Sequence, residues 1–298
     1  MTEPKVSVIV ATYRRDISLK NALESIAAQS YRNIEIILVD DNDNAEWNEK
    51  VSVIADVFTE KHSDIPFTCA VNHPNLGSAK TRNVGIESAT GDYICFLDDD
   101  DLYLPERIKN QVTAMETSAA DYGLTDLALY TEADSLIEVR KRDYVKDTSE
   151  QSLLQYHLMH HMTGTDTLMF KTEYIKSMGG FDPIDVGDEF YLMLKAIQHG
   201  GKFLYVPVCD VKAYVHTGEE GLSSGQSKIN GENMLYEYKK KYFTELDKKT
   251  VKYIKMRHHL VLAFAFLRMK QYGSFFVEGV QAVLCDVIGS LKFVLNRK

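Results

Sequence analysis

The chain carries YICFLDDDD at residues 93–101, where an apolar stretch runs directly into four consecutive aspartates. The apolar part predicts a buried strand with the carboxylates at its carboxyl end. Neighbouring carboxylates about 5 Å apart repel each other by roughly 3 kcal/mol per pair at an effective dielectric constant near 20, so the run is costly unless a cation lies among its oxygens. Such hard oxygen ligands suit Mg²⁺ or Mn²⁺. The alternative is a solvated turn whose aspartates cap the helix that follows.

Apolar stretches upstream of this motif predict three more strands, at residues 6–11, 34–39 and 67–71. Segments with the helical spacing of apolar residues lie between them, and Pro105 suits the first turn of a helix after the aspartates. Strands that alternate with helices predict an α/β fold, in which βαβ units build a mostly parallel, Rossmann-like sheet flanked by helices. Ligands of such sheets bind outside the carboxyl ends of the strands.

The second half of the chain is less regular. Further elements are expected there, namely strands at residues 127–130, 136–139, 167–170 and 202–206 and a helix at residues 189–198. We therefore expect a catalytic domain over residues 1–220, followed by a helical C-terminal region over residues 221–298.

Charge is distributed unevenly along the 298 residues. The net charge is −9, but residues 248–298 hold ten Lys and Arg against two acids, which gives +8 there and −17 for the rest of the chain. An acidic main body disfavours a nucleic-acid partner. The four cysteines have neither zinc nor redox spacing, and the first residues have no signal-peptide pattern, so we expect a cytoplasmic protein with reduced thiols.

Polar residues follow two of the other strands as well. Thr12 and Tyr13 follow the first strand, where a tyrosine can stack on a base and a threonine can hydrogen-bond to it. Asp41 follows the second strand, where its carboxylate either accepts hydrogen bonds from a nucleobase or ribose or forms an Asx turn. Arg82 lies near a predicted helix start and either holds a diphosphate or base edge or belongs to a solvated basic turn.

Taken together, these segments closely resemble the family-2 glycosyltransferases of the GT-A fold. The resemblance extends over roughly residues 4–220, and its motifs occur in the family's order. It is carried by VSVIVATY at residues 6–13, VDD at 39–41, NLG at 75–77 with KTRNVGI at 80–86, GDYICFLDDDD at 91–101, GGFD at 179–182 and GDE at 187–189.

The resemblance implies a transfer reaction. A sugar would move from a nucleoside diphosphate sugar to a hydroxyl group of a saccharide or lipid-linked saccharide, in polysaccharide or glycolipid synthesis. The reaction would depend on Mn²⁺ or Mg²⁺ and would invert the anomeric centre. Uridine diphosphate sugars are the favoured donors, and thymidine diphosphate sugars come next.

The resemblance also implies how the nucleotide is held. Thr12, Tyr13 and Asp41 would bind the uracil or another pyrimidine. Arg82 would lie near the base and the diphosphate.

The aspartate run looks like the DxD motif of the family. Asp98 and Asp99 would face the ribose or the metal, in an order that four consecutive aspartates leave open, and Asp100 would ligate the metal directly. A histidine at the position of His216 approaches the metal or diphosphate in some relatives, and the alternative for His216 is a structural role.

The pair Asp188-Glu189 matches the acidic pair that supplies the catalytic base in the family. The usual order is Glu then Asp, and this chain reverses it. By position Glu189 is the base, and the reversal keeps Asp188 as the alternative. Either carboxylate can take a proton from an acceptor hydroxyl.

Two other functions remain open on the sequence alone. A sugar-phosphate nucleotidyltransferase has a similar sheet, but it usually opens with a glycine-rich phosphate loop, and the first strand here leads into Ala11-Thr12-Tyr13-Arg14 without a glycine. A non-catalytic, membrane-bound sensor of nucleotide sugars would bind the donor and would not need Glu189.

The basic tail predicts peripheral contact with an anionic membrane. Lysines between residues 248 and 257 precede a short apolar stretch at 260–267, and a second stretch at 275–295 contains Glu278, Asp286 and Lys292. Neither stretch reaches the about 20 mostly apolar residues that a bilayer span requires. Basic residues beside apolar helix faces suit an interfacial anchor, here on the inner face of the cell membrane. The alternative is that these helices pack on the catalytic domain or form a dimer interface.

Overall fold

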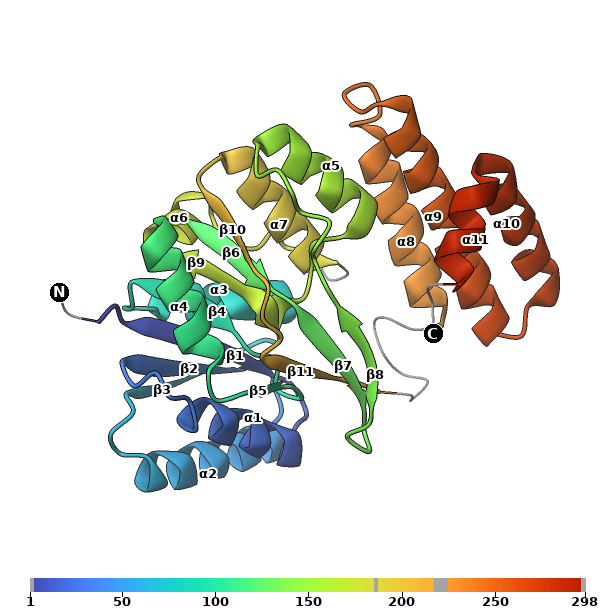
Figure 1. Ribbon diagram of the computed structural model, residues 1–298. Helices are drawn as coiled ribbons and strands as arrows, with labels where there is room; N and C mark the ends of the chain where they lie inside the picture. The colour runs from blue at the N-terminus through green and yellow to red at the C-terminus, as the bar shows by residue number, and fades with distance from the viewer. Residues whose placement is uncertain (1–2, 185–186, 217–224, 296–298) are drawn as a thin grey trace. The chain divides into compact units, whose positions relative to one another are not determined.

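The computed structural model describes residues 3–184, 187–216 and 225–295 (Figure 1). The chain forms two compact units. One unit comprises Met1–Glu150 and Met162–Val215, and the other comprises Gln151–His161 and His216–Lys298. The domain boundary predicted near residue 220 falls within residues 217–224, which lie outside the described residues.

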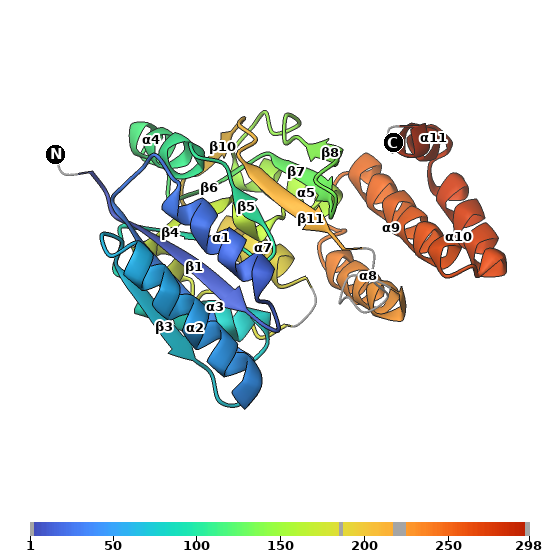
Figure 2. The ribbon, with the colours of Figure 1, turned by 90° about the horizontal axis from the view of Figure 1, so that it is seen from below.

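The first unit is built around a seven-stranded sheet with helices on both faces (Figures 1 and 2). Its strands, in spatial order, are β10 (Phe203–Val206), β6 (Tyr122–Thr125), β9 (Leu168–Lys171), β4 (Tyr93–Phe96), β1 (Val6–Thr12), β2 (Ile34–Asp40) and β3 (Phe67–Val71). The strands from β4 to β3 are parallel, and β9 runs antiparallel to both of its neighbours. The mostly parallel α/β sheet that the sequence predicts is confirmed.

A smaller sheet follows the aspartate run. Its strands, in spatial order, are β5 (Leu102–Tyr103), β11 (Val211–Val215), β7 (Leu127–Thr131) and β8 (Leu136–Arg140). The backbone N–H of Tyr214 in β11 donates to a carboxylate oxygen of Asp101 at 2.8 Å, so this sheet fixes the end of the aspartate run.

Alternate residues of β1 face two different layers of helix. Val6, Val8 and Val10 share one buried cluster with apolar residues of three helices, α1 (Ile17–Ala27), α2 (Ala45–Lys61) and α4 (Arg107–Ser118). Ile9 points the other way, toward α3 (Ser78–Ser88), where a Cβ on Gly85 would overlap the Ile9 side chain. The continuous apolar sequence of β1 therefore reflects burial on both faces.

Short strands account for the differences from the predicted elements. The sequence analysis predicts β1 to β4 but includes neither β6 nor β11, because four or five residues of mixed polarity give no clear period. Packing explains why residue 123 in β6 is a glycine, since a Cβ there would lie 2.6 Å from the carbonyl oxygen of Leu204 in the neighbouring strand. Glycine inside a strand often marks such a close backbone approach.

One buried carboxylate lies inside the sheet. Glu35 of β2 accepts hydrogen bonds from Ser7 Oγ at 2.6 Å and from the backbone N–H of Thr90 at 2.8 Å, and it pairs with Lys5 Nζ at 2.6 Å. Burial by itself would raise the pKa of Glu35, but the hydrogen bonds from Lys5, Ser7 and Thr90 outweigh it and lower the pKa to about 2. Glu35 therefore joins β1, β2 and the segment before β4.

We expect Glu35→Gln to lower the free energy of unfolding at pH 7 by about 2 kcal/mol. Because the folded-state pKa lies below the ordinary value of 4.5, this stability is present above pH 4.5 and is lost as the pH falls toward 2. Urea unfolding at pH 7 and pH 3 measures both effects. Glu46→Gln, at an exposed position of α2, serves as the control. An equal loss of unfolding free energy in the two variants would contradict the role given to Glu35.

The second unit is helical throughout its described residues. It contains most of α5 (Glu150–His160) together with α8 (Gly225–Lys240), α9 (Lys248–Arg268), α10 (Tyr272–Cys285) and α11 (Val287–Leu295). Asp247 caps α9 by accepting from the backbone N–H groups of Lys249 and Thr250. Gln155 of α5 donates to Thr250 Oγ1 at 2.6 Å, which joins α5 to the start of α9.

Candidate active site

The parallel strands β1, β2 and β4 end at one edge of the large sheet, and each brings polar residues there. Thr12 lies opposite Asp40 in the register of β1 and β2, and Asp98 follows the end of β4 by two residues. Segments that are far apart in the sequence therefore meet at this edge, as expected for a ligand site of a parallel sheet.

Asp41 holds the turn that leads into α3. Its Oδ1 accepts from the backbone N–H of Leu76 at 2.8 Å and from Asn72 Nδ2 at 2.9 Å, and its Oδ2 accepts from the N–H of Gly77 at 2.9 Å. Gly77 has φ +80°, a left-handed conformation that favours glycine. The carboxylate is buried and bonded within the protein, and its predicted contact with a pyrimidine stays a prediction.

Asp99 joins the ends of β1 and β4. Its Oδ2 accepts from Thr12 Oγ1 at 2.7 Å and from the backbone N–H of Tyr13 at 3.1 Å. Burial, and then the charge of Asp100, raises the pKa of Asp99 to about 7, although these two hydrogen bonds act in the opposite direction. The ring of Tyr13 is 47% exposed, so the predicted base-stacking side chain is open to solvent next to this carboxylate.

Asp100 forms an ion pair with Arg15. The distance between Arg15 Nη2 and Asp100 Oδ2 is 2.8 Å. Arg15 lies in the segment between β1 and α1, so this pair links that segment to the aspartate run. The role of direct metal ligand for Asp100 stays a prediction.

Three other aspartates form a compact group of carboxylates. Among the described residues, Asp98, Asp101 and Asp166 have carboxylate oxygens that all lie within 4.8 Å of one another. Burial and the neighbouring charge of Asp166 raise the pKa of Asp101, and burial and the charge of Asp98 raise that of Asp166. Three crowded carboxylates of this kind suit a hard divalent cation.

A buried arginine positions Asp166. Arg107 of α4 is fully buried, and its Nη2 donates to the backbone carbonyl of Asp166 at 2.8 Å. Gln111, one turn further along α4, donates to the carbonyl of Thr167 at 3.1 Å. The backbone N–H of Asp98 in turn donates to Asp166 Oδ1 at 2.7 Å. The segment at residues 165–167 is therefore fixed both to α4 and to the aspartate run.

Arg82 connects the aspartate run to the acidic pair on α7 (Asp188–His199). Its Nη2 donates to Asp98 Oδ1 at 2.6 Å, and its Nη1 donates to Asp188 Oδ2 at 2.8 Å. Burial by itself would lower the pKa of Arg82, but these two carboxylates raise it, so the guanidinium keeps its charge. Ser78 Oγ also donates to Asp188 Oδ2, at 3.1 Å.

Glu189 is held on one side. Its Oε2 accepts from the backbone N–H groups of Gly164 at 2.7 Å and Thr165 at 3.1 Å, and no hydrogen bond to its Oε1 occurs among the described residues. Burial, and then the charge of Asp188, raises the pKa of Glu189. By contrast, Asp188 has both oxygens engaged, since its Oδ1 accepts from the N–H of Glu189 at 2.9 Å.

His216 follows β11 directly and is exposed. It belongs to the second compact unit, whereas the acidic group belongs to the first. Its predicted role at the metal or diphosphate stays a prediction.

The model of the family described as "Glycosyl transferase family 2" matches residues 7–176, which is more than half of the chain. The matched residues include the ends of β1 and β2, the aspartate run and Asp166. The chain belongs to glycosyl transferase family 2.

Curated relatives of this chain are themselves named glycosyltransferases. An uncharacterized glycosyltransferase of Methanocaldococcus jannaschii is 28% identical over 205 residues, which cover 68% of each chain. The Escherichia coli protein WfaP, named UDP-Glc:α-D-GlcNAc-diphosphoundecaprenol β-1,3-glucosyltransferase, is 27% identical over 77% of this chain and 85% of its own. Other bacterial relatives are matched over less than half of their own length.

Solved structures confirm the GT-A fold of the glycosyltransferase. Residues 1–349 of Staphylococcus aureus TarS, in complex with UDP-GlcNAc, match with a TM-score of 0.59 and 15% identity, over 94% of this chain and 91% of that one. The mannosyltransferase PcManGT of Pyrobaculum calidifontis, in complex with GDP-Man and Mn²⁺, matches with a TM-score of 0.60 and 19% identity, over 99% of this chain and 79% of that one. Likeness at this level of identity establishes the fold.

Four residues of the candidate site are not singled out by the sequence. These are Arg15, Ser78, Asp101 and Asp166, of which Asp101 enters the sequence analysis only as the last residue of the aspartate run. Asp166 follows no apolar strand and stands in no recognisable motif, so nothing in its neighbourhood marks it. Its place becomes evident only when β9 is inserted antiparallel beside β4.

Proposed function

We propose that this glycosyltransferase moves a sugar from a nucleoside diphosphate donor to a hydroxyl acceptor with inversion at the anomeric carbon. The observation that carries the proposal is the chain of contacts from the group of Asp98, Asp101 and Asp166, through Arg82, to Asp188 beside Glu189. These contacts join three crowded carboxylates to a glutamate whose Oε1 accepts no hydrogen bond among the described residues. In the proposed reaction, the first group would serve the leaving diphosphate and the second would serve the acceptor.

The residues fit a divalent metal. Asp98, Asp101 and Asp166 would hold it, and the resemblance to the family adds Asp100 and His216 as further predicted ligands. A bound Mn²⁺ or Mg²⁺ supplies a Lewis acid that neutralises charge on the leaving diphosphate. Arg82 is occupied by two carboxylates, so we infer that it orients Asp98 and Asp188 rather than binding the donor through a free guanidinium.

Glu189 is the general base of the proposed reaction. Two backbone N–H groups fix its Oε2, which leaves Oε1 to take the proton of the acceptor hydroxyl. As that proton leaves, the acceptor oxygen forms a bond to the anomeric carbon, and the bond from that carbon to the diphosphate oxygen breaks on the opposite face. Asp188 is the weaker alternative, because Arg82, Ser78 and the N–H of Glu189 already occupy its oxygens.

Uridine diphosphate sugars are the proposed donors, with thymidine diphosphate sugars next. Support comes from the name of the Escherichia coli relative, a UDP-Glc-dependent enzyme, and from the UDP-GlcNAc complex of the structural neighbour TarS. Thr12 and Tyr13, held at the end of β1 by Asp99, are the proposed contacts of the pyrimidine.

The proposed acceptor is a lipid-linked saccharide or a growing polysaccharide at the inner face of the cell membrane. The support is the Escherichia coli relative, whose name specifies a diphosphoundecaprenol-linked sugar. The proposed contact with this membrane is peripheral. Among the described residues, every helix is too short or too polar to cross a membrane.

Thermal unfolding with a panel of nucleotide sugars tests the proposed donor class. We expect UDP-glucose or UDP-GlcNAc with Mn²⁺ to raise the melting temperature, because a ligand that binds only the folded state stabilises it by about 2.7 kcal/mol at 100 times its Kd. GDP-mannose and the matching free sugars are the controls. A shift with GDP-mannose that exceeds every shift with a UDP-sugar would contradict the proposal that the donor nucleotide is uridine diphosphate.

A further inference from the structure

The last two helices of the second unit expose mainly apolar side chains. We define the α10–α11 face by Phe276, Val280, Leu284, Ile288, Leu291 and Leu295, which are between 57% and 74% exposed. Apart from Tyr272, the exposed polar side chains of these two helices are Gln281 and Lys292. Exposed apolar side chains are normal when they occur singly, but six of them at successive turns of two consecutive helices indicate a surface that meets a partner.

The two acids of this segment do not interrupt the face. Glu278 is turned toward α9, where its Oε2 lies 2.7 Å from His259 Nδ1. Asp286 lies between α10 and α11, accepts from the backbone N–H of Gly289 at 3.1 Å and pairs with Lys252 Nζ at 3.6 Å. Glu278 is therefore hydrogen-bonded to His259, and Asp286 is paired with Lys252. Among the exposed side chains of α10 and α11 that the structure describes, Lys292 is the charged one.

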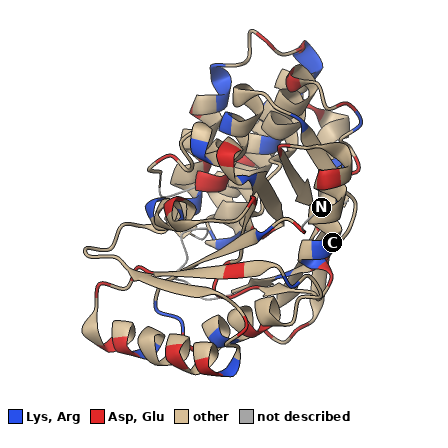
Figure 3. Cartoon of the chain, turned by 90° about the vertical axis from the view of Figure 1, so that its left-hand side faces the viewer, with Lys and Arg blue, Asp and Glu red and all other residues tan. Residues whose placement is uncertain are grey.

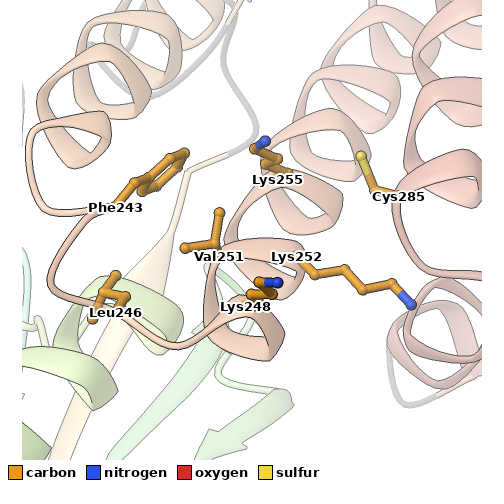
Figure 4. Close-up of a pocket in the computed structure, with 7 residues that line it drawn as sticks. All are labelled: Phe243, Leu246, Lys248, Val251, Lys252, Lys255 and Cys285. Carbon is orange, nitrogen blue, oxygen red and sulfur yellow. The ribbon is translucent and has the colours of Figure 1, made fainter.

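Basic residues lie near both ends of α10. Arg268 and Lys270 precede α10, and Lys252 reaches the junction of α10 with α11 through its pair with Asp286. Figure 4 shows Lys248, Lys252 and Lys255 along α9 at an open groove of about 350 Å³. Its other lining residues are Phe243, Leu246, Val251 and Cys285. Lysines beside apolar side chains suit a phosphate group joined to acyl chains.

An ordinary surface helix of the same protein looks different. Along the lower edge of Figure 3, α2 carries acidic and basic residues side by side, with Lys50 paired to Glu46 at 2.9 Å. Its exposed valines, Val53 and Val57, lie one turn apart on a helix that also exposes the acids Glu49, Asp56 and Glu60. The α10–α11 face is therefore unusual within this chain, and α2 supplies a matched control for it.

We propose that the α10–α11 face docks into the surface of an anionic lipid bilayer, with the lysines of α9 against the lipid phosphates. The bordering charges favour this occupant over a second copy of the chain, because two identical faces would bring basic borders of the same sign together. Such a helix pair lies in the interface with its apolar side among the acyl chains. The inference deepens the proposed peripheral contact and takes its biological setting, a lipid-linked acceptor, from the proposed function.

Vesicle sedimentation of the full chain tests the docking surface. The wild type is expected to pellet with vesicles of phosphatidylglycerol and phosphatidylcholine, to stay in solution with phosphatidylcholine alone and to be partly released by high salt. The double variant Val280→Glu, Leu284→Glu should stay in solution. Its control, Val53→Glu with Val57→Glu on α2, should pellet like the wild type. Lys248→Ala and Lys255→Ala should each weaken partitioning about fivefold, as expected for the loss of roughly one lysine contact with an anionic surface.

Two further measurements keep the outcomes separate. Sedimentation velocity reports association between copies, and a dimer that Val280→Glu, Leu284→Glu dissociates, without any binding to vesicles, would overturn the proposal. Equal pelleting of the α10 double variant and the wild type would overturn it as well. Consumption of UDP-sugar without vesicles is measured in parallel. If the wild type binds vesicles but consumes no UDP-sugar, the result counts against the proposed function and not against the proposed docking surface.

Discussion

Glu189→Gln is expected to lower the rate of sugar transfer by about 10²-fold or more while donor affinity stays near normal. Glutamine keeps the shape of the side chain, and its carbonyl oxygen can still accept from the N–H groups of Gly164 and Thr165. The change therefore removes the ability to accept a proton and little else. Initial rates at saturating donor, together with donor titration by calorimetry, separate the two effects.

The pH dependence provides a second readout for the base. Burial and the charge of Asp188 raise the pKa of Glu189, so its ionised form appears at a higher pH than for an ordinary glutamate. The rising acid limb of kcat/KM should therefore lie above pH 4.5 in the wild type and should disappear in Glu189→Gln. Asp188→Asn is the matched variant, and it should keep this limb but move it to lower pH, because the charge of Asp188 no longer raises the pKa of Glu189. A crippling effect of Asp188→Asn beside a mild effect of Glu189→Gln would show that the base is assigned to the wrong residue.

Removal of divalent metal by a chelator is expected to abolish transfer, and added Mn²⁺ or Mg²⁺ should restore it. The physical reason is the crowding of Asp98, Asp101 and Asp166, whose oxygens lie within 4.8 Å of one another. A metal contributes several kcal/mol of charge stabilisation, and each 1.36 kcal/mol changes the rate tenfold, so a loss of 10²-fold or more is expected. Initial rates in excess chelator measure the loss, and full activity there would contradict metal dependence.

Single substitutions identify the ligands. Asp98→Asn and Asp166→Asn should weaken Mn²⁺ binding, measured by electron paramagnetic resonance, while circular dichroism reports that the fold survives. Asp100→Asn tests the ligand role that the resemblance predicts against the ion pair with Arg15 that the structure contains. Asp64→Asn, at an exposed carboxylate paired with Arg32, is the control. Unchanged Mn²⁺ affinity in Asp98→Asn and Asp166→Asn would exclude this group as the metal site.

The strands at residues 6–11 and 34–39 could be predicted because burial on both faces makes them continuous apolar stretches, and each lies within a strand of the structure. Residues 67–71 coincide with β3, an edge strand whose residues are half-buried or exposed, and it was predicted from its apolar residues alone. β6 and β11 could not be predicted, since these short segments become strands through pairing with β9, β10 and β7, which lie far away in the sequence. Gly123, for instance, is explained by the backbone of β10 and by nothing in its own neighbourhood.

The candidate site divides in the same way. Thr12, Asp41 and the aspartate run could be found because they stand directly after predicted strands. Asp166 could not, because it reaches the site through an antiparallel strand and through Arg107, a buried contact between segments far apart in sequence. The acids of the tail illustrate the same limit. In the sequence, Glu278 is a charge that interrupts an apolar stretch. The fold shows that its side chain contacts His259 of α9.

Identification of the nucleotide released from the donor tests the central claim most directly. The chain is incubated with UDP-glucose or UDP-GlcNAc, Mn²⁺ and a lipid-linked saccharide, and the products are separated by liquid chromatography and mass spectrometry. The account predicts UDP and an acceptor heavier by one sugar, with neither product formed by Glu189→Gln at a comparable rate. Pyrophosphate released from a nucleoside triphosphate and a sugar phosphate, or tight donor binding without any turnover, would contradict it.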